Sequence, residues 1–185
     1  LSGANFTLLA PTGSYAVHSP LLGHFNVENL LASLIAAECA GFDLADLVEF
    51  VPQLQGAPGR MQVIQDANRL FVVDYAHTPD ALIQVLTTLK RHVTGQLWAV
   101  FGCGGDRDRG KRPLMTQAAL DHANPVILTS DNPRTEDPAQ IFADMKQGMN
   151  FTEHLMHEIH DRREAIKFVV AQAQAGDIVV IAGKG

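Results

Sequence analysis

The sequence of 185 residues predicts an α/β fold with a mostly parallel sheet that is covered by helices on both faces. Short apolar runs alternate with helical patterns after residue 60, and this alternation favours right-handed crossovers between parallel strands. Apolar residues make up 46% of the chain and charged residues 18%, which provides a core and argues against disorder. The Pro- and Gly-rich stretch Pro52–Gly59 reads as a linker, so we expect two domains, 1–57 and 58–185.

The first of these domains is expected to be a small mixed unit. Strand-like runs flank a turn at Pro11–Ser14, and two helical patterns follow them. Asn26 is expected to cap the first helix, which should end near Gly41, and Asp43 is a candidate cap for the second. The expected strands are Asn5–Ala10 and Tyr15–His18, and the expected second helix is Leu44–Phe50.

The second domain is expected to supply the sheet. Four apolar runs have the length and composition of buried strands, and a fifth is weaker. The expected strands are Leu70–Val73, Leu97–Phe101, Val126–Thr129, the weak run Leu155–Ile159, and Ile178–Ala182. Helical patterns lie between them, and three of these begin at a proline, which suits the first turn of a helix. The expected helices are Pro79–Arg91, Pro113–His122, Pro138–Met149 and Arg162–Ala173.

Charge and cysteine content exclude several classes of protein. The formal net charge of -6 argues against a nucleic-acid partner and against binding to an anionic membrane. No apolar run approaches the roughly 20 residues that span a bilayer. Two cysteines, Cys39 and Cys103, cannot form a disulfide framework or a four-ligand metal site, so we expect a reducing cytoplasm. The chain starts at Leu1 and ends in Gly-Lys-Gly, and we expect it to be a piece of a longer protein.

Polar segments follow the predicted strands at the points where these strands end. In open α/β sheets, ligands bind beyond the carboxyl ends of the strands, so these segments should form the site. The four segments are Asp74–Asp80, Gly102–Pro113, Ser130–Thr135 and Gly183–Gly185.

The glycine-rich segment admits two interpretations. Gly105 to Lys111 matches the spacing of a phosphate-binding loop, but Arg112 stands where Ser or Thr should hold magnesium. We therefore favour a tight glycine turn on which Arg107 offers forked donors to a carboxylate or phosphate. A solvated charged loop is the alternative. Cys103 is a candidate nucleophile or a structural thiol.

The tetrapeptide Asp131-Asn132-Pro133-Arg134 combines a carboxylate, an amide and a guanidinium. Such a set satisfies both the ammonium and the carboxylate of an amino acid. On local chemistry, an ordinary Asn-Pro turn before the next helix explains it equally well. His77, just after a strand, is a candidate ligand contact or a packing residue.

Several motifs in order resemble the Mur ligase family, and within it the diaminopimelate-adding ligases. The resemblance covers essentially the whole chain. It implies the end of a central ATPase domain followed by most of a Rossmann-like C-terminal ligase domain. The matching motifs are Leu22-Gly23, Phe25–Asn29, Gly59–Met61, Val73–Asp80, Gly102–Pro113, Asp131–Glu136 and Ala182–Gly185.

The resemblance implies an ATP-dependent amide ligase of peptidoglycan biosynthesis. ATP would phosphorylate a carboxylate of UDP-N-acetylmuramoyl-L-alanyl-D-glutamate, and an amine of meso-diaminopimelate would attack the acyl phosphate. The residues implied for the diaminopimelate pocket are Arg107, Asp131, Asn132, Pro133, Arg134 and Gly183. The residues implied for ATP are Asn29 at the adenine, Arg60 at a phosphate, Asp74 at the ribose and His77 beside them.

The same resemblance implies what this stretch of sequence lacks. The phosphate loop and the Mg²⁺ ligands of the family have no counterpart in it, so we expect no catalytic and no metal-binding residues here. We also expect no ligase activity from this chain alone. Gln62 stands where the family often has Glu, which puts a salt bridge at that position in doubt.

Alternatives of two classes are open. One is a related amide ligase, either lysine-adding or similar to folylpolyglutamate synthase; Arg134 discriminates, because lysine-adding relatives generally lack it. The other is a non-catalytic module that binds an amino acid. In either case we expect small-molecule partners, a monomer, and neither nucleic acid nor membrane.

Overall fold

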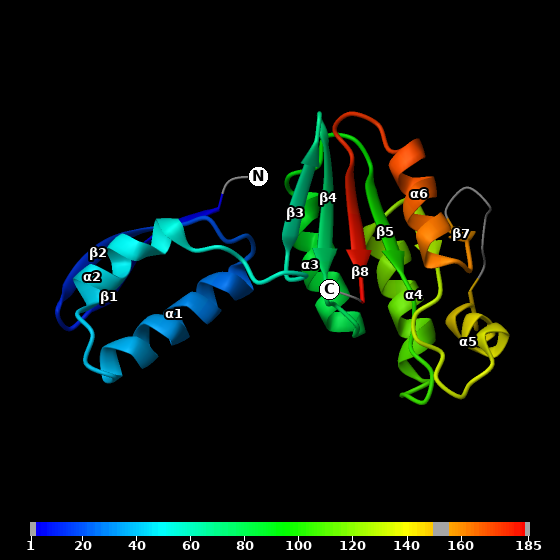
Figure 1. The fold of residues 1–185 in the computed structure, drawn as a ribbon, viewed down its shortest axis with the longest axis horizontal. Helices are drawn as coiled ribbons and strands as arrows, with labels where there is room; N and C mark the ends of the chain where they lie inside the picture. The colour runs from blue at the N-terminus through cyan, green and yellow to red at the C-terminus, as the bar shows by residue number, and fades with distance from the viewer. Residues whose placement is uncertain (1–2, 150–155, 184–185) are drawn as a thin grey trace. The chain divides into compact units, whose positions relative to one another are not determined.

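The structure is a computed structural model that describes residues 3–149 and 156–183. The chain divides into two compact units, Leu1–Ala57 and Pro58–Gly185. Figure 1 shows the first unit in blue to cyan and the second in green to red. No helix among the described residues has the length and apolar character needed to cross a membrane.

The first unit is a β-hairpin with two helices. Its elements are β1 (Ala4–Ala10), β2 (Gly13–Ser19), α1 (His24–Cys39), α2 (Leu44–Phe50) and a 3₁₀ turn (Val51–Gln53). The strands are antiparallel, and Ala10 pairs with Gly13 across the turn. Val17 of β2 packs with Leu30 and Leu34 of α1 in a small core. The two expected strands and two expected helices of this unit are present.

The start of α1 differs from the expectation. Gly23, at φ 91°, is the N-cap, so the helix begins two residues before Asn26. The Asn26 side-chain amide donates to the carbonyl of Leu22 instead of capping the helix. Asp43 does cap α2, because its carboxylate accepts from the backbone N–H of Ala45.

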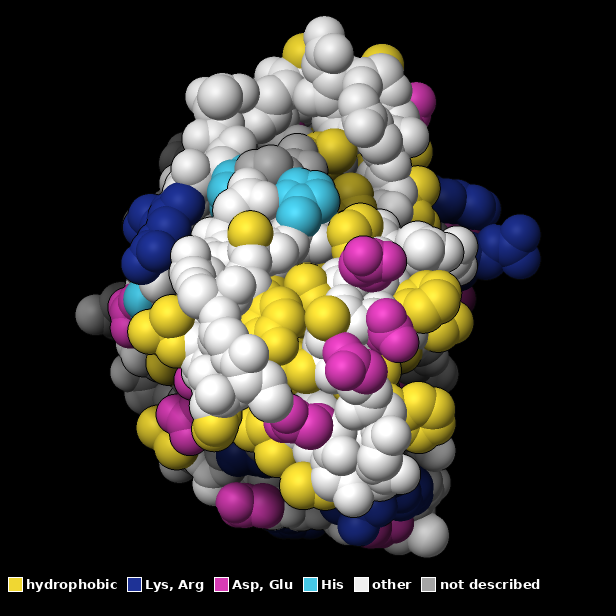
Figure 2. Space-filling model, turned by 90° about the vertical axis from the view of Figure 1, so that its left-hand side faces the viewer, with side chains coloured by type: hydrophobic (Ala, Val, Ile, Leu, Met, Phe, Trp, Pro, Cys, Tyr) yellow, Lys and Arg dark blue, Asp and Glu magenta, His cyan; other side chains and the backbone are white. Residues whose placement is uncertain are grey.

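The first unit also leaves large hydrophobic side chains open to solvent. Leu9, Ile35, Phe42 and Phe50 are all exposed. Figure 2 shows hydrophobic and acidic side chains next to one another on the face that it presents. An exposed apolar surface of this kind is characteristic of a protein–protein or domain contact.

The second unit is built on a six-stranded sheet. Its strands are β3 (Gln62–Asp66), β4 (Arg69–Asp74), β5 (Leu97–Phe101), β6 (Val126–Leu128), β7 (Met156–Glu158) and β8 (Ile178–Ala182), and its helices are α3 (Pro79–Lys90), α4 (Lys111–His122), α5 (Pro138–Met145) and α6 (Arg162–Gln172). The order across the sheet is β3-β4-β8-β5-β6-β7. All pairs are parallel except β3 with β4, so the predicted mostly parallel sheet is confirmed.

Helices cover both faces of this sheet. On one face, Val169 of α6 packs against Trp98, Val100 and Val179 of neighbouring strands. Helices α3 and α4 lie on the opposite face (Figure 1), and Leu82, Leu86 and Leu89 of α3 are buried. Because both faces are buried, β5 and β8 are apolar at every position rather than alternating.

One strand of this unit was missed, and two helix boundaries were predicted incorrectly. Strand β3 was missed, because an edge strand with all five residues exposed carries no apolar pattern. Helix α4 begins at Lys111, so Pro113 lies inside its first turn, where a proline removes no helical hydrogen bond. Helix α5 ends at Met145, followed by a turn that reaches Gly148 at φ 78°. Leu155, in the predicted weak strand, is outside the described residues.

Candidate functional site

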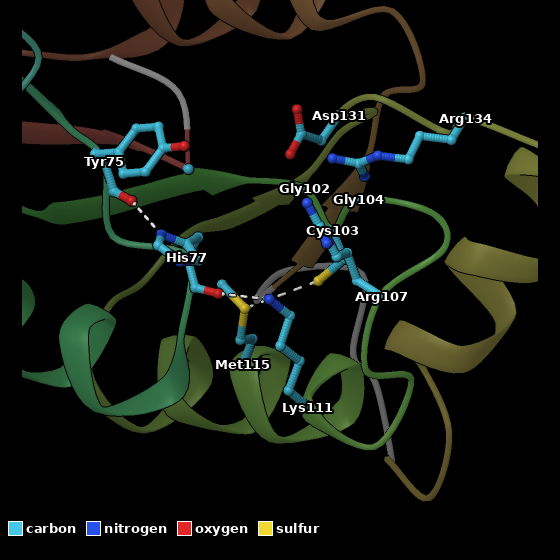
Figure 3. A pocket seen from close by; sticks show the side chains of 11 residues that line it. Tyr75, His77, Gly102, Cys103, Gly104, Arg107, Lys111, Met115, Asp131 and Arg134 are labelled. Atoms are coloured by element: carbon cyan, nitrogen blue, oxygen red, sulfur yellow. Dashed lines mark hydrogen bonds between the residues drawn. The ribbon is translucent and has the colours of Figure 1, made fainter.

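A pocket of about 270 Å³ lies at the carboxyl ends of the central strands of the second unit (Figure 3). The loops after β4, β5, β6 and β8 and the first turns of α4 contribute to it. Its lining residues are Tyr75, His77, Gly102, Cys103, Gly104, Arg107, Lys111, Met115, Asp131, Arg134 and Gly183.

The strand order explains why these loops meet. Strand β8 lies between β4 and β5, and β6 follows β5, so the four loops are neighbours along one edge of the sheet. Gly183, just after β8, donates its backbone N–H to the carbonyl of Asp74 at the end of β4 (3.0 Å). This is the edge at which open parallel sheets bind ligands.

The loop after β5 lies directly against the loop after β6, and glycines permit this approach. A Cβ on Gly102 would come within 2.3 Å of the Thr129 carbonyl oxygen, and one on Gly105 within 1.9 Å of the Pro133 carbonyl oxygen. The Gly105 N–H donates to the carbonyl of Asn132 (2.9 Å). The glycines therefore permit the close packing of the two loops.

A buried cluster of charged side chains connects the loop after β5 with the loop after β6. The Arg112 guanidinium is fully buried and donates to both oxygens of Glu136 (2.8 and 3.0 Å) and to Asp144 (2.7 Å). Glu136 also accepts from the backbone N–H of Asp106 (2.5 Å). Hydrogen bonds from Arg112 lower the pKa of Glu136 to about 2. We call Arg112, Glu136 and Asp144 the loop clamp.

Arg134 is held in place by its backbone as well as by its side chain. Its φ of 50° is left-handed, which turns the chain sharply after Pro133. Its backbone N–H donates to the Asn132 side-chain oxygen (3.1 Å), and its guanidinium donates to the Gly105 carbonyl (2.6 Å). Figure 3 shows the Arg134 guanidinium directed toward Asp131 over the glycine loop.

Charge in the pocket is predominantly positive. Arg107, Lys111 and Arg134 line it, whereas Asp131 is the one carboxylate among the lining residues. Such a pocket favours an anionic ligand, because guanidinium and ammonium groups bind carboxylates and phosphates.

The loop after β4 brings the rings of Tyr75 and His77 to the pocket, and Arg60, which precedes β3, stacks on one of them. Tyr75 meets His77 edge to face at 5.1 Å between ring centroids. The Arg60 guanidinium lies over the Tyr75 ring, 4.6 Å from its centroid. Lys111 donates from Nζ to the carbonyl oxygen of His77 (3.0 Å). A chain of contacts therefore runs from Arg60 through Tyr75 and His77 to Lys111.

Asp74 and Cys103 are both buried. Asp74 accepts from the backbone N–H groups of Met61 (2.9 Å) and Ala76 (2.8 Å), and it does not line the pocket. Burial raises the pKa of the Cys103 thiol to about 11 despite the nearby charges of Lys111 and Arg112. A thiol with that pKa is protonated at neutral pH, so the interpretation of Cys103 as a nucleophile is not supported.

Some of the predicted site residues line the pocket, and others do not. The structure brings five of them to one pocket, namely His77, Arg107, Asp131, Arg134 and Gly183. Asn132 and Pro133 do not line the pocket; the Asn132 side chain accepts from the backbone N–H of Arg134, and the Pro133 carbonyl lies against Gly105. Asn29 is exposed on α1 of the first unit, and Arg60 reaches the pocket rim only through Tyr75.

Sequence reasoning missed Tyr75, Lys111 and Met115 as lining residues. Tyr75 and Lys111 stand inside motifs that were recognised, but nothing in the spacing shows which way a side chain points. Among the described residues, no three His, Cys, Asp or Glu side chains lie together as a metal-binding group.

The profile of the Mur ligase family, glutamate ligase domain, matches residues 59–185. The chain belongs to the Mur ligase family. The match covers the entire six-stranded sheet and every loop that lines the pocket.

Individual relatives agree. The chain is 50% identical to a UDP-N-acetylmuramoyl-L-alanyl-D-glutamate–2,6-diaminopimelate ligase of Ectopseudomonas mendocina over 184 residues, and 46% identical to one of Geobacillus thermodenitrificans; each match covers 99% of this chain. A solved structure of a ligase of that name is 83% identical over 100% of the chain, with a TM-score of 0.70. The chain spans 38% of the length of each of these three relatives.

Proposed function

We propose that the full protein containing this Mur ligase segment adds meso-diaminopimelate to UDP-N-acetylmuramoyl-L-alanyl-D-glutamate at the expense of ATP. The observation that carries the proposal is the pocket in which Arg107 and Arg134 lie with Asp131. Relatives that match 99% of this chain bear the name of that activity. In this proposal, residues 1–57 are the end of the central ATPase domain, and residues 58–185 are the ligase domain.

The charges of the pocket suit this amino acid. Diaminopimelate differs from lysine by one further carboxylate, at the end remote from the attacking amine. A planar guanidinium binds a carboxylate through two parallel hydrogen bonds. We assign Arg107 and Arg134 to that remote carboxylate and Asp131 to the ammonium group beside it. Asn132 and Pro133 position Arg134, and Gly183 closes the pocket at the end of β8.

The nucleotide contacts are a further part of the proposal. Asn29 would contact the adenine, Arg60 a phosphate and Asp74 the ribose, with His77 beside them. The stacking of Arg60 on Tyr75 supports the assignment of Arg60, because it holds a guanidinium against a residue that lines the pocket.

The reaction proceeds in two steps. The γ-phosphoryl group of ATP passes to the D-glutamyl side-chain carboxylate, giving an acyl phosphate and ADP. The neutral amine of diaminopimelate then attacks the acyl carbon, phosphate leaves with its bonding electrons, and the amine loses a proton. The residues of this chain contribute by orienting the amine, which removes much of the entropic part of the barrier. In this family Mg²⁺ neutralises phosphate charge, and its ligands are assigned elsewhere in the protein; the chain alone is expected to be inactive.

Substitution of Arg134 tests the proposal. In the full-length protein, Arg134→Ala should lower kcat/KM for meso-diaminopimelate by about 2–3 kcal/mol of transition-state stabilisation, or roughly 30- to 150-fold, since a charged hydrogen bond is lost. The much poorer use of lysine should change far less. Arg163→Ala, an exposed arginine on α6, is the control. Near-normal diaminopimelate kinetics in Arg134→Ala would refute the assignment of the pocket.

The alternatives are separated by the same measurement. A lysine-adding enzyme would show higher kcat/KM for lysine than for diaminopimelate without any substitution. A folylpolyglutamate-synthase-like ligase would use glutamate, and a binding module would release no phosphate with any amino acid. The proposal also includes a monomer acting in the cytoplasm on small-molecule substrates.

A further inference from the structure

Lys111 is the one lysine or arginine lining the pocket to which the function proposed above assigns no role. It is half-buried, and it lines the pocket together with Arg107 and Arg134. Figure 3 shows its side chain rising from α4 toward the carbonyl of His77, to which Nζ donates at 3.0 Å. An ammonium group has three N–H donors, so this bond leaves two others available.

Arg112, the next residue along the chain, differs from Lys111 in having carboxylate partners. Arg112 is neutralised by Glu136 and Asp144 in the loop clamp. Within the described residues, no Asp or Glu forms an ion pair with Lys111. A half-buried cation without a carboxylate partner is unfavourable in the empty pocket and becomes favourable when an anionic group arrives.

Charge matching identifies that group. Diaminopimelate carries two carboxylates, and the two arginines and Asp131 account for the remote carboxylate and its ammonium neighbour. The carboxylate next to the attacking amine then has no cation except Lys111. We propose, building on the function proposed above, that Lys111 binds this carboxylate and thereby orients the amine that attacks the acyl phosphate.

This contact has a second consequence for the amine. A nearby positive charge disfavours the protonated form of an amine and so increases its neutral, nucleophilic fraction at a given pH. The His77 carbonyl keeps the Lys111 ammonium on the β4 side of the pocket. The contacted carboxylate is present in lysine as well as in diaminopimelate. Lys111 therefore contributes to binding of both amino acids, whereas Arg134 discriminates between them.

That difference defines the experiment. In the full-length protein, steady-state kinetics with meso-diaminopimelate and with lysine are measured for Lys111→Gln, Lys111→Arg and Arg134→Ala. Lys111→Gln should lower kcat/KM roughly 10- to 100-fold for both amino acids by similar factors. Its KM for ATP should stay within twofold. Lys111→Arg should recover a substantial part of the loss, because it restores the charge.

Lys167→Gln is the matched control, because Lys167 is exposed on α6 and pairs only with Glu164. Thermal unfolding of each variant confirms that it is folded, and Lys111→Ala replaces Lys111→Gln if the latter is not. Equal kinetics of Lys111→Gln and the unmodified enzyme with both substrates would overturn the inference. So would a loss confined to diaminopimelate, or one that Lys111→Arg does not relieve.

Failure of the proposed function gives a different result. If the unmodified enzyme prefers lysine, the diaminopimelate assignment is wrong, and the lysine kinetics of Lys111→Gln alone decide the role of Lys111. If it uses neither amino acid, both proposals fail.

Discussion

The absence of a Cβ at glycine determines how closely the loop after β5 and the loop after β6 approach each other. A Cβ added to Gly105 would meet the backbone of Pro133, and a backbone cannot move away as a flexible side chain would. Gly110, in the same loop, would place a Cβ 3.2 Å from a side-chain oxygen of Asp108, which can shift. Two glycines of one loop are therefore expected to respond very differently to the same substitution.

We predict that Gly105→Ala destabilises the protein by about 1–3 kcal/mol, the usual cost of overpacking. Gly110→Ala, at φ -61°, should change stability by less than about 0.5 kcal/mol. Urea unfolding followed by circular dichroism measures both. If the two variants unfold at the same urea concentration, the close approach of the loops is not what requires glycine at position 105.

At the scale of elements, the loop clamp connects α4 and α5 with both loops of the pocket. Arg112 comes from the first turn of α4, Glu136 precedes α5, and Asp144 lies within α5. A buried arginine that loses its carboxylates is left as an unpaired charge, which is far more costly than the pair is stabilising. The clamp is therefore expected to control the stability of the pocket more than its ligand chemistry.

The clamp predicts a specific dependence on pH. Arg112 lowers the pKa of Glu136 from its usual 4.5 to about 2 in the folded protein. Because the folded pKa is the lower one, the ionised carboxylate stabilises the folded state above pH 4.5, and this contribution disappears as the pH falls toward 2. We predict that the stability advantage of the unmodified protein over Glu136→Gln is largest at neutral pH and shrinks across that window.

Urea unfolding at pH 7, 4.5 and 3 tests this, and the difference between the two proteins removes the contributions of other carboxyl groups. Glu164→Gln is the control, since Glu164 forms an exposed pair with Lys167 and should have little effect at any pH. An advantage that is constant from pH 7 to pH 3 would contradict the ionised clamp.

At the scale of the whole molecule, the chain is two units joined by an exposed segment. Residues 52–58 are all exposed, and the division between units falls at Ala57 and Pro58. Strand β5, in contrast, is buried at all five positions. Proteases cut where the backbone is accessible and can unfold locally.

We predict that a protease of broad specificity cuts first between Pro52 and Gly59. Mass spectrometry of early products should show two fragments with one boundary in this segment. The larger fragment should then resist further cleavage, because it contains the complete sheet. First cuts within β5 or β8 would show that the second unit is not an independent compact body.

Much of this protein could be predicted from residues that are close in sequence. The alternation of apolar runs and helical patterns after residue 60 predicted the parallel sheet, because strands buried on both faces are apolar throughout. Strand β3, Gln62–Asp66, was not predicted, because an edge strand needs no apolar face and forms through backbone hydrogen bonds to β4. The start of α1 was misplaced because Asn26 bonds to the backbone of Leu22, a choice that its sequence neighbours do not determine.

For the site, too, some features could be predicted from the sequence and others depended on the tertiary structure. The rule that ligands bind beyond the carboxyl ends of strands predicted the edge of the sheet. Local chemistry suggested Arg107 as a contact for a carboxylate or phosphate and left the tetrapeptide at residues 131–134 open between an amino-acid contact and an ordinary turn. The family resemblance assigned both to a diaminopimelate pocket. Only the tertiary structure placed β8 between β4 and β5, which brings His77 and Gly183 into one pocket with them. Only the structure separated Arg112 from Lys111, two adjacent cations with opposite surroundings. A side chain on a helix turns about 100° from the last, so adjacent residues face different environments, and only packing decides which of them is buried with carboxylates and which meets the ligand.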